Sequence, residues 1–235
     1  MRKVSLHHYT QKDLDSYLAR DSISSWLAAN TTEKEEKLGC NKWLTTTPIK
    51  RLIFNDIYAN LLGEERGKNI LDIGGGVTAY TKILGAFHDY TLIDLLSHDD
   101  QLIAENIFRE HNITFLKDDW QNVSFSNKFD IVICNDLLPN VDQRIKMFLE
   151  KFLPISSSIS ILLTYQNNDR FYKVKRTDAD EIMFLQAWSG AQLRQVLEPI
   201  FPELEEDVLQ GLITNRPSPY ENGRLTSLLR VEQLL

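Results

Sequence analysis

Residues Asn69 to Thr81 read Asn-Ile-Leu-Asp-Ile-Gly-Gly-Gly-Val-Thr-Ala-Tyr-Thr. A short apolar run that contains Asp72 ends in three glycines, and a helical pattern follows over 78–84. This order predicts a strand that turns sharply into a helix, because glycine adopts positive φ and lets a ligand approach the backbone. Such a helix start directs unpaired N–H groups and the positive end of its dipole at the ligand. We therefore expect a nucleotide-like ligand at this turn.

Two ligands compete for the turn. Gly74, Gly76 and Ala79 fit the dinucleotide pattern G-x-G-x-x-G/A, and Asp94 follows at about the right distance for a ribose contact. Asp72 separates the candidates, because a carboxylate so close to the loop would repel the diphosphate of NAD. S-adenosylmethionine (SAM) carries an amino group and a sulfonium and lacks phosphates. The carboxylate therefore favours SAM.

From these residues the chain resembles the class I SAM-dependent methyltransferases, whose first motif is an acidic residue, one spacer and a G-x-G loop. Asp72, Gly74 and Gly76 match that motif, with Gly75 inside the loop, and Thr78 stands where many members carry a third glycine. The resemblance implies SAM as the cofactor and S-adenosylhomocysteine (SAH) as the product.

Two later strand ends extend the resemblance towards the rest of the cofactor. Residues 90–94 form an apolar segment that ends in Asp94, and the resemblance implies that this acid accepts hydrogen bonds from both ribose hydroxyls. Residues 113–120 end in Asp118, Asp119 and Trp120. The family places an acid here on the adenine amino group. Asp119-Trp120 fits the family's acid-plus-aromatic pair better than Asp118 does. A shift of the motif by one residue would instead give this role to Asp118.

The catalytic candidates follow the next two predicted strands. Residues 129–138 resemble the fourth motif, whose strand end lies beside the transferred methyl group, and 158–165 would be the fifth strand. Asn135 is thus a candidate for both cofactor binding and catalysis, and Tyr165 is a second catalytic candidate. Asp136 is the favoured base, or the group that positions the acceptor.

Each motif also has a purely structural interpretation. The glycines could form an ordinary tight turn. Asp94 could cap the following helix, although Ser97 is the better cap. Asp118 and Asp119 could lie in a solvated turn, and Asn135 and Asp136 could cap a helix that begins near Val141.

The fold predicted from the alternating elements is α/β: a doubly wound, mostly parallel seven-stranded sheet with a C-terminal antiparallel strand, plus an N-terminal helical extension. We divide the chain into a helical lid, 1–65, and a SAM-binding methyltransferase domain, 66–235. Thr47-Pro48 begins a helix that Gly63 closes. Further helices are expected over 99–110, 141–152 and 178–188, and from a capping box at Ser189–Gln192 to near Pro199. Extended segments are expected over 207–214 and 226–232, paired antiparallel.

The composition limits the classes of partner that the chain is expected to bind. The 235-residue chain has a net charge of −7, which argues against nucleic-acid backbone and anionic membrane. It has no apolar run long enough for a membrane span and no signal peptide. Cys40 and Cys134 give no disulfide framework, and a cytoplasmic location is the default. The histidines and cysteines lack metal-ligand spacing, so we predict no metal.

These observations predict a methyltransferase that acts on an oxygen or nitrogen atom of a small-molecule metabolite. A homodimer is left open. His7 and His8 could face the substrate, although a solvated terminus is favoured for them. The alternatives are a protein or nucleic-acid methyltransferase, an NAD(P)-dependent oxidoreductase, and a noncatalytic SAM-binding partner.

Overall fold

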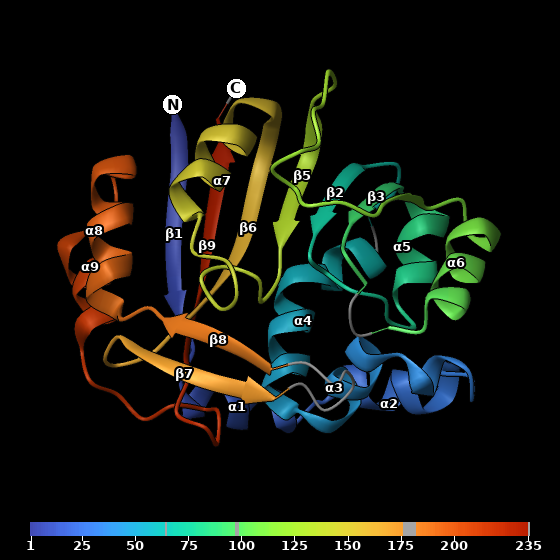
Figure 1. Cartoon of the computed structure of the whole chain (residues 1–235), viewed down its shortest axis with the longest axis horizontal. Helices are drawn as coiled ribbons and strands as arrows, with labels where there is room; N and C mark the ends of the chain where they lie inside the picture. Colours follow the sequence, from blue (N-terminus) through green and yellow to red (C-terminus); the bar gives the residue numbers. More distant parts are fainter. Residues whose placement is uncertain (64, 97–98, 176–181, 235) are drawn as a thin grey trace. The chain divides into compact units, whose positions relative to one another are not determined.

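The computed structural model describes residues 1–63, 65–96, 99–175 and 182–234, and the chain divides into two compact units (Figure 1). One unit contains residues 12–133. The other contains residues 1–11 and 134–235.

The unit of residues 12–133 contains the glycine turn. Its strands are β2 (Asn69–Ile73), β3 (Asp89–Ile93), β4 (Thr114–Leu116) and β5 (Phe129–Cys134, whose last residue belongs to the other unit). Its helices are α1 (Gln11–Leu18), α2 (Ser22–Asn30), the 3₁₀ turn η1 (Glu35–Lys37), α3 (Gly39–Thr46), α4 (Pro48–Leu62), α5 (Thr81–Phe87) and α6 (Gln101–Glu110). β3 runs parallel to both β2 and β4. The predicted start of α4 at Pro48 and its end at Gly63 are confirmed.

The other unit contains both chain ends. Its strands are β1 (Arg2–His8), β6 (Ser156–Tyr165), β7 (Arg170–Lys175), β8 (Ile182–Ala187) and β9 (Leu225–Gln233). Its helices are α7 (Ile145–Phe152), the 3₁₀ turn η2 (Leu153–Ile155), α8 (Gly190–Ile200) and α9 (Glu206–Ile213). α8 and α9 lie beside β1, and the β7–β8 hairpin forms a separate two-stranded sheet (Figure 1).

The main sheet has seven strands in the order β1-β9-β6-β5-β2-β3-β4. β9 runs antiparallel to β6 on one side and to β1 on the other. This arrangement confirms the predicted mostly parallel α/β sheet with a C-terminal antiparallel strand. The division of the chain at residue 65 stays a prediction.

Three predicted elements are wrong. Arg2–His8, inside the segment expected to be helical, is strand β1, where only Leu6 is buried. The helix expected over 178–188 is replaced over 182–187 by β8, and 178–181 lie outside the described residues. The segment 207–214 belongs to α9 rather than to a strand. Its buried Leu209 and Leu212 lie three residues apart, which is helical spacing.

The predicted helices after the glycine turn exist but begin later than expected. α5 begins at Thr81, α6 at Gln101 and α7 at Ile145. The predicted capping box of α8 is confirmed, because the Ser189 hydroxyl and the Gln192 side chain each accept a backbone N–H of the other residue.

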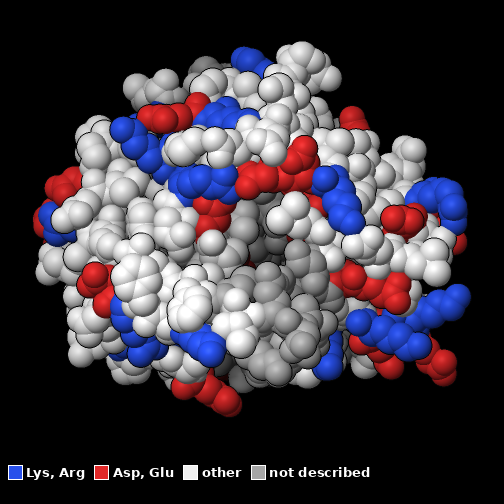
Figure 2. Space-filling view, in the orientation of Figure 1, with Lys and Arg blue, Asp and Glu red and all other residues white. Residues whose placement is uncertain are grey.

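The surface carries both signs of charge. On the face in Figure 2, Lys and Arg side chains are interspersed with Asp and Glu. No extended basic area of the kind that holds a nucleic-acid backbone stands out on this face. No helix in the described part of the chain has the length and apolar character to cross a membrane.

Candidate functional site

The glycine turn has the predicted backbone conformation. It follows β2 directly, and both Gly74 (φ 69°) and Gly76 (φ 64°) lie in the left-handed region that favours glycine. The Gly74 N–H donates to the carbonyl of Ile93 at 2.8 Å, which ties the turn to the end of β3. The sequence therefore identified the turn and the reason for its glycines.

The expectation of unpaired N–H groups at this turn is wrong for the residues that lead into α5. The Gly76 N–H donates to Asp94 Oδ2 at 3.0 Å, and the Val77 N–H donates to Asp99 Oδ2 at 3.3 Å. The Ala79 N–H donates to Asn41 Oδ1 at 2.9 Å. Because α5 begins only at Thr81, these N–H groups turn towards side chains instead of lining up as a helix start. Two of the acceptors are carboxylates, so an incoming phosphate would meet negative charge.

Asp72 lies beneath the turn. Its side chain is 1% exposed, and its Oδ2 accepts hydrogen bonds of 2.8 Å from the hydroxyls of Tyr58 and Tyr90. Its Oδ1 is buried and has no hydrogen-bond partner among the described residues. A Cβ atom added to Gly75 would overlap this carboxylate, so glycine is required for the close approach. Burial raises the pKa of Asp72 to about 6, against the lowering effect of the two tyrosine hydrogen bonds.

Asp94 stands at the end of β3, as the sequence predicted. Besides accepting from Gly76, its carboxylate accepts the N–H of Leu96 at 2.7 Å. It does not cap α6, because the N-cap of that helix is Asp100, which accepts from Leu102 and Ile103. Ser97, the other expected cap, lies outside the described residues. The half-buried carboxylate of Asp94 thus fixes the turn from the side of β3.

Asp118, Asp119 and Trp120 follow β4 in a tight turn. Asp118 is exposed and accepts the Asp119 N–H at 2.7 Å and the Asn122 amide at 2.9 Å. Asp119 is half-buried and accepts the Gln121 N–H at 2.8 Å, and Trp120 is buried. Both acids therefore have structural partners. Their assignment to the adenine stays a prediction.

The sequence did not reveal the part that α3 plays at the turn. Cys40 packs directly against Gly76, so that a Cβ atom there would overlap its side chain. Asn41 is 1% exposed and satisfies Ala79, as described above. Burial raises the pKa of the Cys40 thiol well above its usual range. No pattern in 31–46 pointed to these contacts, because they join residues nearly forty positions apart.

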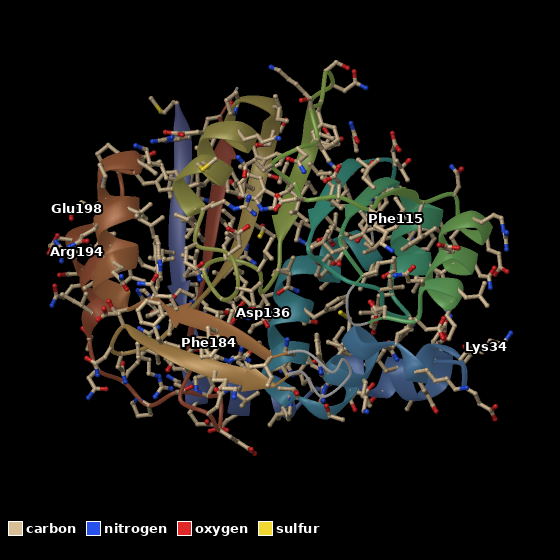
Figure 3. The ribbon with its side chains drawn as sticks, in the orientation of Figure 1. Lys34, Phe115, Asp136, Phe184, Arg194 and Glu198 are labelled. Atoms are coloured by element: carbon tan, nitrogen blue, oxygen red, sulfur yellow. The ribbon has the colours of Figure 1, made fainter. Side chains whose placement is uncertain are left out.

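Asn135 and Asp136 belong to the unit that contains the chain ends, directly after β5 (Asp136 is labelled in Figure 3). Asp136 is half-buried and has φ 62°, a left-handed conformation that Asp and Asn tolerate better than most residues. Its Oδ1 accepts from the Thr164 hydroxyl at 2.9 Å and from the Asn140 amide at 3.2 Å. The N-cap of α7 is Arg144, so the capping alternative for Asn135 and Asp136 is wrong.

A small recess adjoins Asp136. Its volume is about 10 Å³, and its lining residues are Pro139, Asn140, Thr164, Tyr165, Gln166, Tyr172, Ala187 and Arg224. Thr164 and Asn140, which hold Asp136, are among them. The recess lies at the carboxyl end of β6, next to the predicted catalytic candidates Asp136 and Tyr165, whose roles stay predictions.

Tyr165 is 2% exposed, and its hydroxyl lies in a buried network. It accepts from Arg216 Nη2 at 2.6 Å and lies 3.0 Å from Ser227 Oγ. Ser227 Oγ is in turn 2.7 Å from Nδ1 of His8 on β1. Burial raises the pKa of Tyr165. His8, expected at a solvated terminus, is instead part of the packing between β1, β9 and α9.

Within the described residues, no group of three or more His, Cys, Asp or Glu side chains could hold a metal ion. The metal-free site stays a prediction.

The fold and the turn define the class of protein. A mostly parallel α/β sheet with a glycine turn after its first parallel strand is the Rossmann-like arrangement, and the carboxylates around this turn suit a nucleoside without phosphates. Residues 71–152 match a family model described as "Methyltransferase domain". The match covers about a third of the chain, and residues 71–152 are accordingly similar to a methyltransferase domain.

Solved structures share the fold at low sequence identity. The N-methyltransferase NodS from Bradyrhizobium japonicum WM9, in complex with SAH, is 11% identical and has a TM-score of 0.50, over 90% of this chain and 98% of that chain. The N-terminal domain of EvdMO1 with SAH bound is 18% identical, with a TM-score of 0.49 over 77% and 79%. A DhpI–SAH complex is 15% identical, with a TM-score of 0.47 over 94% and 98%. No curated protein matches the chain.

Proposed function

We propose that this chain is a class I SAM-dependent methyltransferase that methylates an oxygen or nitrogen atom of a small-molecule metabolite. The observation that carries the proposal is the half-buried Asp136 carboxylate, which Thr164 and Asn140 hold beside a recess of about 10 Å³. A protein or nucleic-acid acceptor needs an open, extended surface, and Figure 2 offers no extended basic area for a nucleic acid. A cytoplasmic location and a homodimer remain predictions.

The residues around the glycine turn fit SAM. The free, buried Oδ1 of Asp72 lies directly against Gly75, where a cationic amino group would supply its missing partner. Asp94 would accept from the ribose hydroxyls, and Asp119 with Trp120, or Asp118, would bind the adenine. Asn135 would lie at the methyl end of the cofactor. When bound, SAM supplies an electrophilic methyl group on its sulfonium.

Asp136 would act on the acceptor. SAM would supply the methyl group, and the Asp136 carboxylate would take the proton that the acceptor loses on methylation. The hydrogen bonds from Thr164 and Asn140 both reach Oδ1, which holds the carboxylate in one orientation. Tyr165 lines the recess, but its hydroxyl is engaged with Arg216 and Ser227, so we assign it a positioning role for the end of β6.

The part of the proposal that concerns the cofactor is tested by calorimetric titration of the full chain with SAH and, in parallel, with NADH. We expect micromolar binding of SAH alone. The Asp94→Ala variant should weaken SAH binding by about 1–3 kcal/mol, because two ribose donors lose a charged acceptor. Because Asp94 also holds the turn, urea unfolding must accompany the titration. Unchanged SAH affinity in a folded Asp94→Ala protein removes Asp94 from the site.

The part of the proposal that concerns the methyl acceptor is tested with SAM that carries a labelled methyl group. The protein is incubated with a cell extract, which is then separated by size into small molecules, nucleic acid and protein. We expect label in the small-molecule fraction. Label confined to protein or nucleic acid would overturn the acceptor class while leaving the cofactor assignment intact.

A further inference from the structure

Arg224, in the loop before β9, has an unusual environment for an arginine. Its Nε is buried and has no hydrogen-bond partner among the described residues. Among the described residues, its Nη1 donates to Asn140 Oδ1, at the long distance of 3.5 Å, and its guanidinium lies 4.7 Å from the centre of the Tyr220 ring. A buried donor without an acceptor is costly, typically by about 1–3 kcal/mol. A ligand that supplies an acceptor there is therefore favoured.

Asn140 separates Arg224 from the Asp136 carboxylate. The amide nitrogen of Asn140 donates to Asp136, and its oxygen faces Arg224. No salt bridge joins Arg224 to an acid in the part of the chain that the structure describes. A positive and a negative group thus stand on either side of one amide, both next to the recess.

Two further buried groups nearby lack partners in the described residues. The Tyr220 hydroxyl belongs to a side chain that is 7% exposed, and Thr226 is 0% exposed. Thr226 pairs across the ladder with Thr164, which donates to Asp136. Burial and then the charge of Asp136 raise the pKa of Tyr220, so its hydroxyl keeps its proton. Unsatisfied polar groups so close together are typical of a ligand site rather than of a packed core.

The size of the recess limits the ligand group. Its volume of about 10 Å³ is roughly that of one water probe, so it admits a single ligand oxygen and not a whole metabolite. The Nε–Nη2 edge of a guanidinium matches the two oxygens of a carboxylate. A phosphate group is bulkier, and its second charge would be repelled by Asp136.

We propose that this recess binds a carboxylate of the methyl acceptor through the Nε–Nη2 edge of Arg224. The proposal rests on the function proposed above and narrows the acceptor to a small carboxylic acid. Its oxygen or nitrogen nucleophile lies towards Asp136, on the other side of Asn140.

The test follows the arginine Nε–H signals of the full chain, saturated with SAH, by ¹⁵N–¹H nuclear magnetic resonance. Acetate and glycine are titrated in, with acetamide as the neutral probe and sodium chloride as the ionic-strength control. We expect one Nε–H signal to shift saturably with the carboxylates alone, and to be missing in Arg224→Lys and Arg224→Gln. The Lys variant keeps the positive charge in case the Gln variant fails to fold.

Arg194 provides the matched control, because its Nε already donates to Glu198 on the exposed side of α8 (both labelled in Figure 3). Its signal, assigned with Arg194→Gln, should not respond to any probe. Three results overturn the proposal: no saturable shift with any carboxylate, an equal shift with sodium chloride or acetamide, or a saturable shift with inorganic phosphate instead of carboxylates.

Turnover gives a second, independent measurement. Label transfer from SAM is measured over metabolite carboxylic acids and their primary amides. The acids alone should be methylated, and Arg224→Gln should lower kcat/KM by about 10- to 100-fold through KM, while SAH affinity stays constant. An amide that serves as well as its acid overturns the inference. Failure of the proposed function is distinguishable, because it appears as a loss of SAH binding in the wild-type protein.

Discussion

Among single residues, Asp72 is the clearest case of a buried carboxylate that costs stability when it is charged. Its carboxylate is buried, and one oxygen has no partner in the described residues. Because the folded state raises its pKa from 3.8 to about 6, the carboxyl group costs nothing below pH 3.8, where it is protonated in both states. The cost grows as the pH rises from 3.8 to about 6, and it is complete above about 6.

Asp72→Asn should therefore stabilise the ligand-free protein at about pH 8. The difference between 3.8 and about 6 corresponds to about 3 kcal/mol, which is the upper limit of the gain in the free energy of unfolding. Urea unfolding measured at about pH 8 and again near pH 4 checks this, since the gain should vanish at the lower pH. Asp94→Asn is the control. It should destabilise the protein, because its charged carboxylate accepts two backbone N–H groups. An equal stability of wild type and Asp72→Asn at both values would contradict the prediction.

A substitution at Asp136 can separate an effect on catalysis from an effect on the folded structure. Asparagine keeps the oxygen that accepts from Thr164 and Asn140, and it tolerates φ 62°. Asp136→Asn should lower kcat by about 10²- to 10⁴-fold, because only the carboxylate can take the proton. Steady-state kinetics with the identified acceptor measures this, and calorimetry should give the wild-type SAH affinity. A variant that retains full kcat would remove the base from Asp136.

At the scale of elements, the sequence predicted those whose local pattern agrees with their burial. The strand before the glycine turn, the helix from Pro48 to Leu62 and the capping box at Ser189 all follow from short-range signals. The positions of α3 and β1 do not follow from short-range signals. Cys40 contacts Gly76 only in the folded unit, and β1 forms a strand because it pairs with β9.

The helix predicted where β8 lies was wrong for the opposite reason, because a local signal was present but misleading. Residues 182–187 read Ile-Met-Phe-Leu-Gln-Ala, and several of these residues are good helix formers. Pairing with β7 overrides that preference. Phe171 and Phe184, 77% and 76% exposed, point away from the side of the hairpin that carries Tyr172 and Ala187 (Phe184 is labelled in Figure 3). For the site, the glycine turn and its flanking acids could be predicted, whereas Arg224, Tyr220 and Cys40 could not, because only tertiary packing brings them to their partners.

The attachment of β1 to α9 should depend on pH. His8 Nε2 donates to the carbonyl of Val208 at 2.8 Å, so a neutral ring accepts the Ser227 hydroxyl at Nδ1. Burial, together with the charges of Arg216 and His7, lowers the pKa of His8 below 6.5. With a lowered pKa, the stabilisation is complete above pH 6.5 and is lost as the pH falls through the folded value.

Wild type should therefore lose more of its free energy of unfolding than His8→Gln between about pH 7.5 and about pH 5.5. Gln supplies a donor and an acceptor without a titrating group. Urea unfolding at several pH values measures the difference. Parallel pH dependence of the two proteins would show that His8 does not titrate in this range.

At the scale of the whole molecule, cofactor binding should stabilise the folded chain by linkage. SAH at 100 times its dissociation constant adds about 2.7 kcal/mol. For a chain of 235 residues this corresponds to a rise in Tm of about 5–10 °C. Differential scanning calorimetry measures the rise, with NADH at the same concentration as the control. A rise with NADH, or none with SAH, would contradict the assignment of the turn.

The β7–β8 hairpin also bears on how such a protein could diversify. It contributes Tyr172 and Ala187 to the recess, yet it forms its own two-stranded sheet and takes no place in the seven-stranded ladder. Exchange of its side chains would reshape the acceptor end without touching the strands that carry the cofactor residues. Changes confined to this hairpin could thus alter which substrates fit, while the seven-stranded sheet stays as it is.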